Sequence, residues 1–304
     1  MIRKFLSILG ILCYAAGNAS AATLDVRQNL SFGTLIPVAN SGSVIISTAG
    51  AITTGGSVTT APSGTSYYQG KVRFTPTLLD VFTIRVADSS IVLNNTTSGN
   101  GSVTIDSFTV NPSSLNISVL AAVDINIGGR MTFSASSKAG TYTGSARVEV
   151  SGLLSGTTSA ILPVTLTFWN SLKMSEKTPL SFGILDINSG ASLVRLNAQT
   201  GARSIVSGIG NVILAMNPAS SSGQFKISGQ PNVPVSISLP SSVSLTGNKG
   251  GTMTVNNFTG YPSSTQLTLD TAGDANLNVG ADLNIGASQL SGIYSGTYSV
   301  TVNY

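Results

Sequence analysis

The sequence predicts an all-β protein with two tandem immunoglobulin-like β-sandwiches that follow a cleaved signal peptide. Three observations support this: a strictly alternating last segment, an internal repeat, and short apolar segments separated by turn residues. In the last segment, residues 292–304, small polar residues alternate with aromatic and β-branched ones, namely Tyr294, Tyr298, Val300, Val302 and Tyr304. Such alternation, rich in aromatic and β-branched residues, indicates a half-buried β-strand whose apolar face we expect in a core.

The internal repeat consists of four blocks that occur twice in the same order. The blocks are LSFG at 30–33 and 180–183, residues 70–86 and 223–239, FTVNPSS at 108–114 and FTGYPSS at 258–264, and residues 127–150 and 279–302. Their offsets are 150, 153, 150 and 152 residues. Chance sharing of a low-complexity composition is the alternative, but conserved order and spacing favour a tandem duplication.

The chain begins with features of an export sequence. Arg3 and Lys4 precede an apolar run at 5–16, and Ala19-Ser20-Ala21 forms a small-residue cleavage site. We expect cleavage after Ala21, since the run is short for a membrane helix. The only cysteine, Cys13, lies inside this run, so the mature chain has no disulfide. The expected location is the periplasm, the cell surface or the extracellular space, without a transmembrane segment.

Each copy of the repeat contains a series of short segments with β-strand character. In the first copy these are residues 24–32, 43–47, 71–74, 81–86, 103–110, 117–123, 130–135 and 142–150. In the second they are residues 162–168, 193–196, 224–227, 235–239, 252–258, 266–269, 282–285 and 294–302. Frequent strands between Gly, Pro, Asn and Ser are typical of sandwiches. The predicted parts are therefore a signal peptide at 1–21, a first domain at 22–155 and a second at 156–304.

The junction between the domains is predicted from a turn-rich loop. SGLLSGTTS at 151–159 is that loop, and the alternating residues 162–168 are expected to form the first strand of the second domain. The charged residues Lys173, Glu176 and Lys177 follow, and we interpret this dense cluster as a solvated turn.

Few residues carry charge. Charged residues make up 9% of the chain, against about 25% in typical globular proteins. The net charge of +4 includes Arg3 and Lys4, so nothing in the mature chain indicates a nucleic-acid partner. Lysine and glutamate on sheet edges normally block unwanted strand addition. With so few of them, either the edges are covered or strand addition is intended.

Side chains for catalysis are scarce. The chain has no histidine, and its one cysteine lies in the expected leader, which excludes histidine-assisted nucleophiles and thiolate sites from the mature chain. The 11 acidic residues are scattered. We therefore expect no enzyme, no catalytic residues, no metal and no cofactor. One group of oxygen-bearing side chains alternates as in a calcium loop: Asp270, Asp274, Asn276, Asn278 and Asp282. No glutamate closes this group, so the polar face of a strand or turn is the favoured interpretation.

Four aromatic residues give a second candidate site. Tyr67, Tyr68 and Tyr261 occupy loop regions and, with Trp169, have rings that stack on sugars. No spacing among them defines a platform, so packing in the core or at an edge is the competing interpretation.

The motifs together resemble a family of bacterial exported β domains, domain of unknown function 4402. The resemblance rests on LSFG, on the F-x-x-x-P-S-S motif, and on a closing G-x-Y-x-G-x-x-x-V-x-V-x-Y, and it covers most of residues 24–152 and 160–304. More distantly, the closing strand is similar to those of chaperone–usher pilins and spore coat U-type proteins. This similarity implies a pilin-like sandwich in which the last strand pairs with a periplasmic chaperone and then with a strand donated by a neighbour.

Two functional hypotheses follow. The first is a non-enzymatic structural or adhesive surface protein that assembles by β-strand pairing with itself or a chaperone. The positions that match the pilin pattern are Gly296, Tyr298, Val300, Val302 and Tyr304. Residues 22–32 could be donated to a neighbour or could form the first strand of their own domain. The second hypothesis is a secreted module that binds carbohydrate or a host surface through the loops at Tyr67, Tyr68 and Tyr261.

Overall fold

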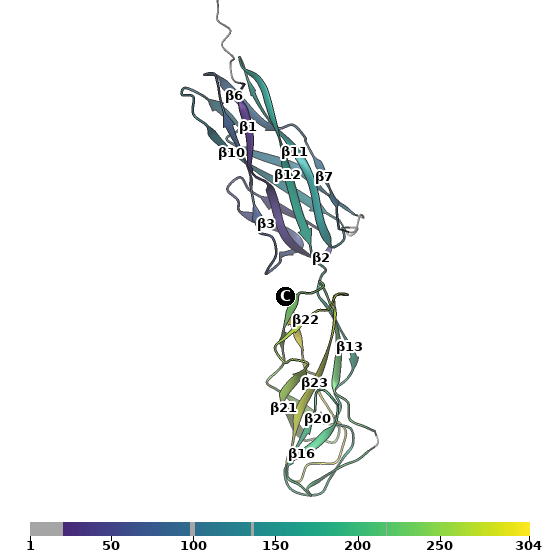
Figure 1. The fold of residues 1–304 in the computed structure, drawn as a ribbon. Helices are drawn as coiled ribbons and strands as arrows, with labels where there is room; N and C mark the ends of the chain where they lie inside the picture. Colours follow the sequence, from purple (N-terminus) through teal and green to yellow (C-terminus); the bar gives the residue numbers. More distant parts are fainter. Residues whose placement is uncertain (1–20, 98–100, 135–136, 217) are drawn as a thin grey trace, which may run out of the picture. The chain divides into compact units, whose positions relative to one another are not determined.

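The computed structural model describes residues 21–97, 101–134, 137–216 and 218–304 (Figure 1). The expected signal peptide, apart from Ala21, lies outside them. The described residues form strands and no helices. The chain divides into two compact units, one with the chain up to Thr34, Ala39–Val58 and Thr65–Thr167, the other with Leu35–Val38, Thr59–Gly64 and Phe168–Tyr304. The prediction of two tandem all-β domains is confirmed.

The first unit is a sandwich whose two layers share long strands. Its strands are β1 (Thr23–Gln28), β2 (Leu30–Ile46), β3 (Ile52–Thr60), β4 (Tyr67–Tyr68), β5 (Gly70–Thr75), β6 (Val81–Val86), β7 (Ile91–Asn95), β8 (Ser102–Asn111), β9 (Ser114–Asn116), β10 (Val123–Phe133), β11 (Gly140–Gly152) and β12 (Gly156–Phe168). One layer runs β1-β5-β10-β8-β7. The other runs β9-β6-β11-β12-β2, and β4 also pairs with β2. The end of β2 crosses over to pair with β10, which joins the two layers.

The second unit repeats the first layer and holds only part of the second. Its strands are β13 (Lys173–Thr178), β14 (Leu185–Ile187), β15 (Ser192–Leu196), β16 (Arg203–Ser207), β17 (Val212–Leu214), β18 (Gly223–Ser228), β19 (Pro234–Ser238), β20 (Ser242–Gly247), β21 (Thr252–Tyr261), β22 (Gln266–Thr268), β23 (Asp274–Ile285), β24 (Tyr294–Ser295) and β25 (Thr301–Asn303). One layer runs β13-β18-β23-β21-β20-β24, and β15 pairs with β23. The other contains the three-stranded sheet β22-β19-β25.

The pairing registers of the two units coincide, as a duplication requires. In unit 1, Val44 on β2 faces Met131 on β10. In unit 2, Val194 on β15 faces Leu283 on β23, at the offsets of 150 and 152 residues found in the sequence. All four side chains are buried in the cores. The repeat in the sequence is therefore a repeat of strand pairing and of core positions.

The structure corrects the predicted junction. The strand at 162–168, expected to open the second domain, belongs to β12, which pairs with β11 and β2 in the sheet of unit 1. Unit 1 thus extends through Thr167 rather than ending near residue 155. The alternation itself was correctly recognised, since Leu162, Val164, Leu166 and Phe168 are buried. Alternation identifies a strand, but it does not identify which sheet the strand joins.

The first strand of the second copy is β13, where a solvated turn was predicted. Met174 on β13 faces Ile227 on β18, just as Leu24 on β1 faces Phe74 on β5. Five of the six residues of β13 are exposed, so the strand has no buried apolar face for the sequence pattern to reveal. β13 ends its sheet, and its charges are of the kind that protects an edge strand.

Candidate functional site

The closing strand of each copy is the candidate site, and the two closing strands have the same inner partners. On β11 of unit 1, Tyr142 faces Asn95 and Val150 faces Ile84. In unit 2, Tyr294 faces Gly247 and Val302 faces Ile237. Each pair is related to its counterpart by 152 or 153 residues. Both closing strands therefore dock on the rest of their sandwich in one register.

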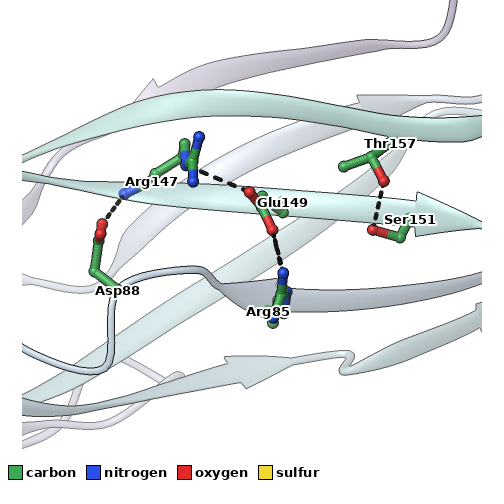
Figure 2. Close-up of polar contacts among 6 residues, drawn as sticks. All are labelled: Arg85, Asp88, Arg147, Glu149, Ser151 and Thr157. Carbon is green, nitrogen blue, oxygen red and sulfur yellow. Dashed lines mark hydrogen bonds and ion pairs between the residues drawn. The ribbon is translucent and has the colours of Figure 1, made fainter.

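The outer edges of the two closing strands differ. In unit 1, β12 lies along β11, and the Ser151 and Thr157 hydroxyls are 2.9 Å apart across the two strands (Figure 2). In unit 2, β24 and β25 each end their sheets, and no strand of the described residues pairs with their outer side. We call this outer side of residues 294–304 the open edge. It leaves backbone N–H and C=O groups without a ladder partner.

The inward side chains of the closing strand are fully buried only in the unit that contains β12. The inward side chains of β11 are at most 1% exposed: Tyr142, Ala146, Val148 and Val150. Their counterparts in unit 2 pack on the core but remain partly exposed: Tyr294, Tyr298, Val300 and Val302. The apolar face predicted to be buried is thus covered in unit 1 and only half covered in unit 2. In unit 1 the cover is provided by Leu162, Val164 and Leu166 of β12, and unit 2 has no strand in that place among its described residues.

One glycine shows how unit 2 partly compensates. A Cβ atom on Gly70 would lie 2.8 Å from Cδ2 of Leu162 on β12 and 3.4 Å from Cβ of Leu30. On Gly223, which corresponds to Gly70, it would meet the Tyr298 hydroxyl and lie 3.3 Å from Cβ of Leu180. Tyr298 therefore occupies the space that Leu162 fills in unit 1.

Tyr298 fills this space at a cost. Its ring centroid lies 5.4 Å from that of Phe258 and 6.2 Å from that of Phe225. The hydroxyl is buried and has no hydrogen-bond partner among the described residues. Burial, and secondarily the negative charge of Glu176, raises the pKa of Tyr298 to about 12. A buried hydroxyl without a partner is destabilising, so this packing is incomplete.

Tyr304 fastens the end of the strand. Its hydroxyl donates to the Asn170 carbonyl over 2.6 Å and accepts the Gln230 N–H over 2.7 Å. Burial raises the pKa of Tyr304, and the Gln230 bond opposes this shift. The ring also packs edge-on against Trp169, with centroids 5.7 Å apart. Trp169 therefore has a packing role in addition to its predicted capacity to stack on a ligand.

Gly296 is required for close approach. A Cβ atom here would lie 2.8 Å from the Ser244 carbonyl oxygen and 2.9 Å from Cδ2 of Leu245. Gly144 is equally crowded in unit 1, against Leu93 and Val92. The glycine therefore lets the closing strand lie close to β20, and any other residue would push it away.

The outward face of the closing strand is charged in unit 1 and uncharged in unit 2. On β11, Glu149 accepts a bond of 2.8 Å from Arg85 and pairs with Arg147 at 3.3 Å (Figure 2). The corresponding residues of unit 2 are Thr301, Ser238 and Ser299. Charges on an edge hinder strand addition, and the open edge lacks them.

The three candidate loop tyrosines do not form one site within a unit. Tyr67 and Tyr68 make up β4 of unit 1, paired with Phe32 and Ser31. Tyr261 ends β21 in unit 2 and lines an open cavity of about 300 Å³, together with Arg195, Asn257 and Asp282 among others. A role for these tyrosines in binding stays a prediction.

The acidic group weighed as a calcium loop already has protein partners. Asp274 pairs with Lys226 at 2.7 Å, and Asp282 forms two bonds to Arg195 at 2.8 and 2.7 Å. Asp270 accepts backbone N–H groups in the turn before β23. Hydrogen bonds from Lys226 and Arg195 lower the pKa values of Asp274 and Asp282. Within the described residues no three metal-ligating side chains gather, and no helix is long and apolar enough to cross a membrane.

The sequence did not reveal that β12 covers the closing strand of unit 1. Gly152, the last residue of β11, corresponds to Tyr304 at the offset of 152 residues. Among the described residues, no strand takes the corresponding place beside the closing strand of unit 2.

The match to a protein-family model agrees with this division. The model of the family described as domain of unknown function DUF4402 matches residues 23–151 and 172–304. Both matches end with the closing strand and leave β12 outside. No curated protein matches the chain. Among solved structures, the chain is similar to one titled as the CsuC–CsuE chaperone–tip adhesion subunit pre-assembly complex of archaic chaperone–usher Csu pili of Acinetobacter baumannii. The TM-score is 0.32 at 10% identity, over 93% of this chain and 100% of that one.

Proposed function

This chain belongs to the DUF4402 family, and on that premise we propose that it is an exported, non-enzymatic structural or adhesive surface protein that assembles by β-strand pairing. In this proposal unit 2 accepts a strand from another polypeptide, in the place that β12 occupies in unit 1. The observation that carries the proposal is the contrast at the closing strand, which is covered by β12 in one copy and open in the other.

The open edge has the two properties that strand addition needs. Unpaired backbone groups provide hydrogen bonds, and partly exposed alternate side chains provide specificity. The inward residues Tyr298, Val300 and Val302 supply an apolar surface for alternate residues of an incoming strand. Ser299 and Thr301 supply an uncharged outward face. The β12 pattern of Leu162, Val164 and Leu166 is therefore the model for the incoming strand.

Tyr298 sharpens this expectation. It occupies the space over Gly223 that Leu162 occupies over Gly70. An incoming strand accordingly has a small residue at the position of Leu162 and larger aliphatic residues at the positions of Val164 and Leu166.

The partner is a periplasmic chaperone or another subunit. Residues 22–32 of a second copy are the weaker candidate, because Leu24 and Val26 on β1 pair with β5 of their own unit, and Leu30 and Phe32 are fully buried. This pairing supports the interpretation of the segment as the first strand of its own domain.

A self-complemented variant tests the proposal. Residues 153–168 are appended directly after Tyr304, which reproduces the covalent order of unit 1. We expect the unfolding free energy of unit 2 to rise by about 3 kcal/mol, the surplus of several buried aliphatic side chains over the cost of ordering a strand. Calorimetry measures this change. Light scattering measures the mass, and oligomers or chaperone complexes of the natural chain should disappear.

The matched control carries Ser in the appended strand at the positions of Leu162, Val164 and Leu166. It has the same length and backbone but no apolar face, so it should leave stability and assembly unchanged. A variant with Ala at the position of Leu162 alone should stabilise unit 2 at least as well as the full strand. Identical behaviour of the apolar and serine extensions would refute the strand-accepting role.

A further inference from the structure

An open cavity in unit 2 is lined mainly by polar side chains from three neighbouring strands and one turn. Its volume is about 300 Å³, and it lies where the end of β15 and the turn after it meet β21 and β23. Small-molecule sites have volumes of about 300–1,000 Å³ and a few precisely placed polar groups. We call it the polar cavity, and the lining residues used below are Arg195, Asn197, Gln199, Asn257, Tyr261 and Asp282.

A buried carboxylate holds Arg195 in one position. The Nε and Nη2 atoms of Arg195 donate to the two carboxylate oxygens of Asp282, which is 4% exposed, over 2.8 and 2.7 Å. The side-chain amide of Asn257 donates to the same carboxylate over 2.9 Å. The Nη1 atom of Arg195 has no partner among the described residues. A guanidinium group fixed in this way keeps N–H donors in a set direction, available to a ligand.

The backbone beside the polar cavity is fixed by the side chains of two asparagines. The Asn197 side-chain oxygen accepts the N–H groups of Gln199 (2.9 Å) and Thr200 (3.0 Å), which shapes the turn after β15. Asn257 has a φ of 49°, within an irregularity of the β21–β23 pairing. Asparagine adopts this conformation more readily than most residues, and such bulges often re-aim a side chain next to a site. The Gln199 side-chain amide has no partner in the described part of the chain, so it is also available to a ligand.

Tyr261 adds a partly exposed aromatic ring to the lining. The residue is 42% exposed, whereas Leu196 and Ala198, the other lining residues with apolar side chains, are buried. The ring is therefore the main apolar surface that the cavity offers. A ring beside fixed hydrogen-bonding groups matches a pyranose sugar, which has C–H groups on one face and hydroxyl groups around its edge. The counterpart of Tyr261 in unit 1 is Asn111, which has no ring.

The ion pair of the polar cavity is also absent from the first copy, although the strands pair in the same register. Arg195 faces Asp282 across β15 and β23. At the corresponding place in unit 1, Ile45 faces Arg130 across β2 and β10. The sandwich therefore folds without this pair, and the fold alone does not account for the polar cavity.

From these observations we propose that the polar cavity binds an uncharged pyranose sugar. Of the described residues that line it, only Arg195 and Asp282 are charged, and they neutralise each other. The cavity thus offers no net charge to a carboxylate, a phosphate or an amine. Tyr261 packs against the C–H face of the sugar, and the free N–H groups of Arg195 and Gln199 donate to its hydroxyls. This inference names a ligand class for the adhesive part of the proposed function and rests on it.

Saturation-transfer difference NMR on the mature chain, residues 22–304, tests the proposal. The probes are the methyl glycosides of glucose, galactose, mannose and N-acetylglucosamine, with methyl glucuronide as the charged comparison. We expect at least one uncharged glycoside to bind, and more tightly than the glucuronide. Tyr261→Ala should weaken this binding about tenfold, while Tyr261→Phe keeps the ring and should bind like the natural chain. Arg195→Lys keeps a cation beside Asp282 but loses the fixed Nη1 donors, and it should also weaken binding about tenfold.

The matched control is Tyr67→Ala in unit 1, because Tyr67 is 41% exposed and Tyr261 is 42% exposed. The control should bind like the natural chain. Equal losses in Tyr67→Ala and Tyr261→Ala, no binding of any of the four uncharged glycosides, or tighter binding of the glucuronide would each overturn the inference.

The test is separate from that of the open edge, because the residues of the polar cavity lie on β15, β21, β23 and the turn after β15, outside the closing strand. The self-complemented variant should therefore bind the sugar like the natural chain. Failure of the strand test with sugar binding intact would refute the strand-accepting role alone. The opposite result would refute the polar cavity as a sugar site alone.

Discussion

The second layers of the two copies differ in what lies beyond the closing strand. Unit 1 has the order β9-β6-β11-β12-β2, whereas the sheet of unit 2 stops at β22-β19-β25. The inner pairings of the closing strand in unit 2 all have the register of their counterparts in unit 1. The difference shows that the register of a closing strand is set by its inner neighbours, while its burial is set by the strand outside it.

The two copies also handle their exposed surface differently. Unit 1 covers the apolar face of its closing strand with β12 and places Glu149 between two arginines on the outward face (Figure 2). Unit 2 leaves both features out and inserts Tyr298 where Leu162 would lie. Unit 1 therefore buries the inward face of its closing strand completely. Unit 2 leaves the corresponding side chains partly exposed along the open edge.

The largest effect is expected from shortening one buried side chain of β12. Leu166→Ala removes a side chain that is 1% exposed and should destabilise unit 1 by about 3 kcal/mol, through lost burial and the remaining cavity. Val300→Ala on the closing strand of unit 2 removes a partly exposed side chain and should cost about 1 kcal/mol. Calorimetric unfolding of the two variants measures both changes. Equal losses would mean that the closing strand of unit 2 is already fully covered.

A second effect concerns pH and again separates the copies. Burial raises the pKa of Asp80, but hydrogen bonds from Leu154, Ser155 and Val81 outweigh this and lower the pKa to about 2 in the folded chain, against about 4 in an unfolded one. Its ionised form therefore stabilises unit 1 above pH 4, and this contribution is lost as the pH falls from about 4 to about 2. Asp80→Asn should flatten the acid limb of the unfolding curve. Unit 2 has Val233 at this position and serves as the internal control. An unchanged acid limb in the variant would show that these hydrogen bonds do not contribute to stability.

Much of this architecture could be predicted from the sequence, because alternation and repetition are local or periodic properties. Prediction of the tandem organisation, the all-β class and the shared inward side of Tyr298, Val300 and Val302 required no knowledge of partners. The sequence could not predict which sheet residues 162–168 join. A strand between β11 and β2 and a strand that begins a new sheet have the same alternating pattern. β13 was missed because an exposed edge strand has no apolar face. The contacts of Asp80 with Leu154, Ser155 and Ile117 were missed because these residues lie far apart in the sequence.

The smallest effect has opposite signs in the two copies, which makes it the sharpest test of incomplete packing. The Tyr142 hydroxyl donates to the Lys138 carbonyl over 2.6 Å and accepts the Lys138 N–H, so Tyr142→Phe should destabilise unit 1 by about 1–2 kcal/mol. The buried Tyr298 hydroxyl has no partner among the described residues, so Tyr298→Phe should stabilise unit 2 by about 1 kcal/mol. Denaturant unfolding with paired variants measures both signs. Destabilisation by Tyr298→Phe would mean that its hydroxyl is hydrogen-bonded in solution, and the space over Gly223 would then be wet rather than an apolar place for an incoming strand.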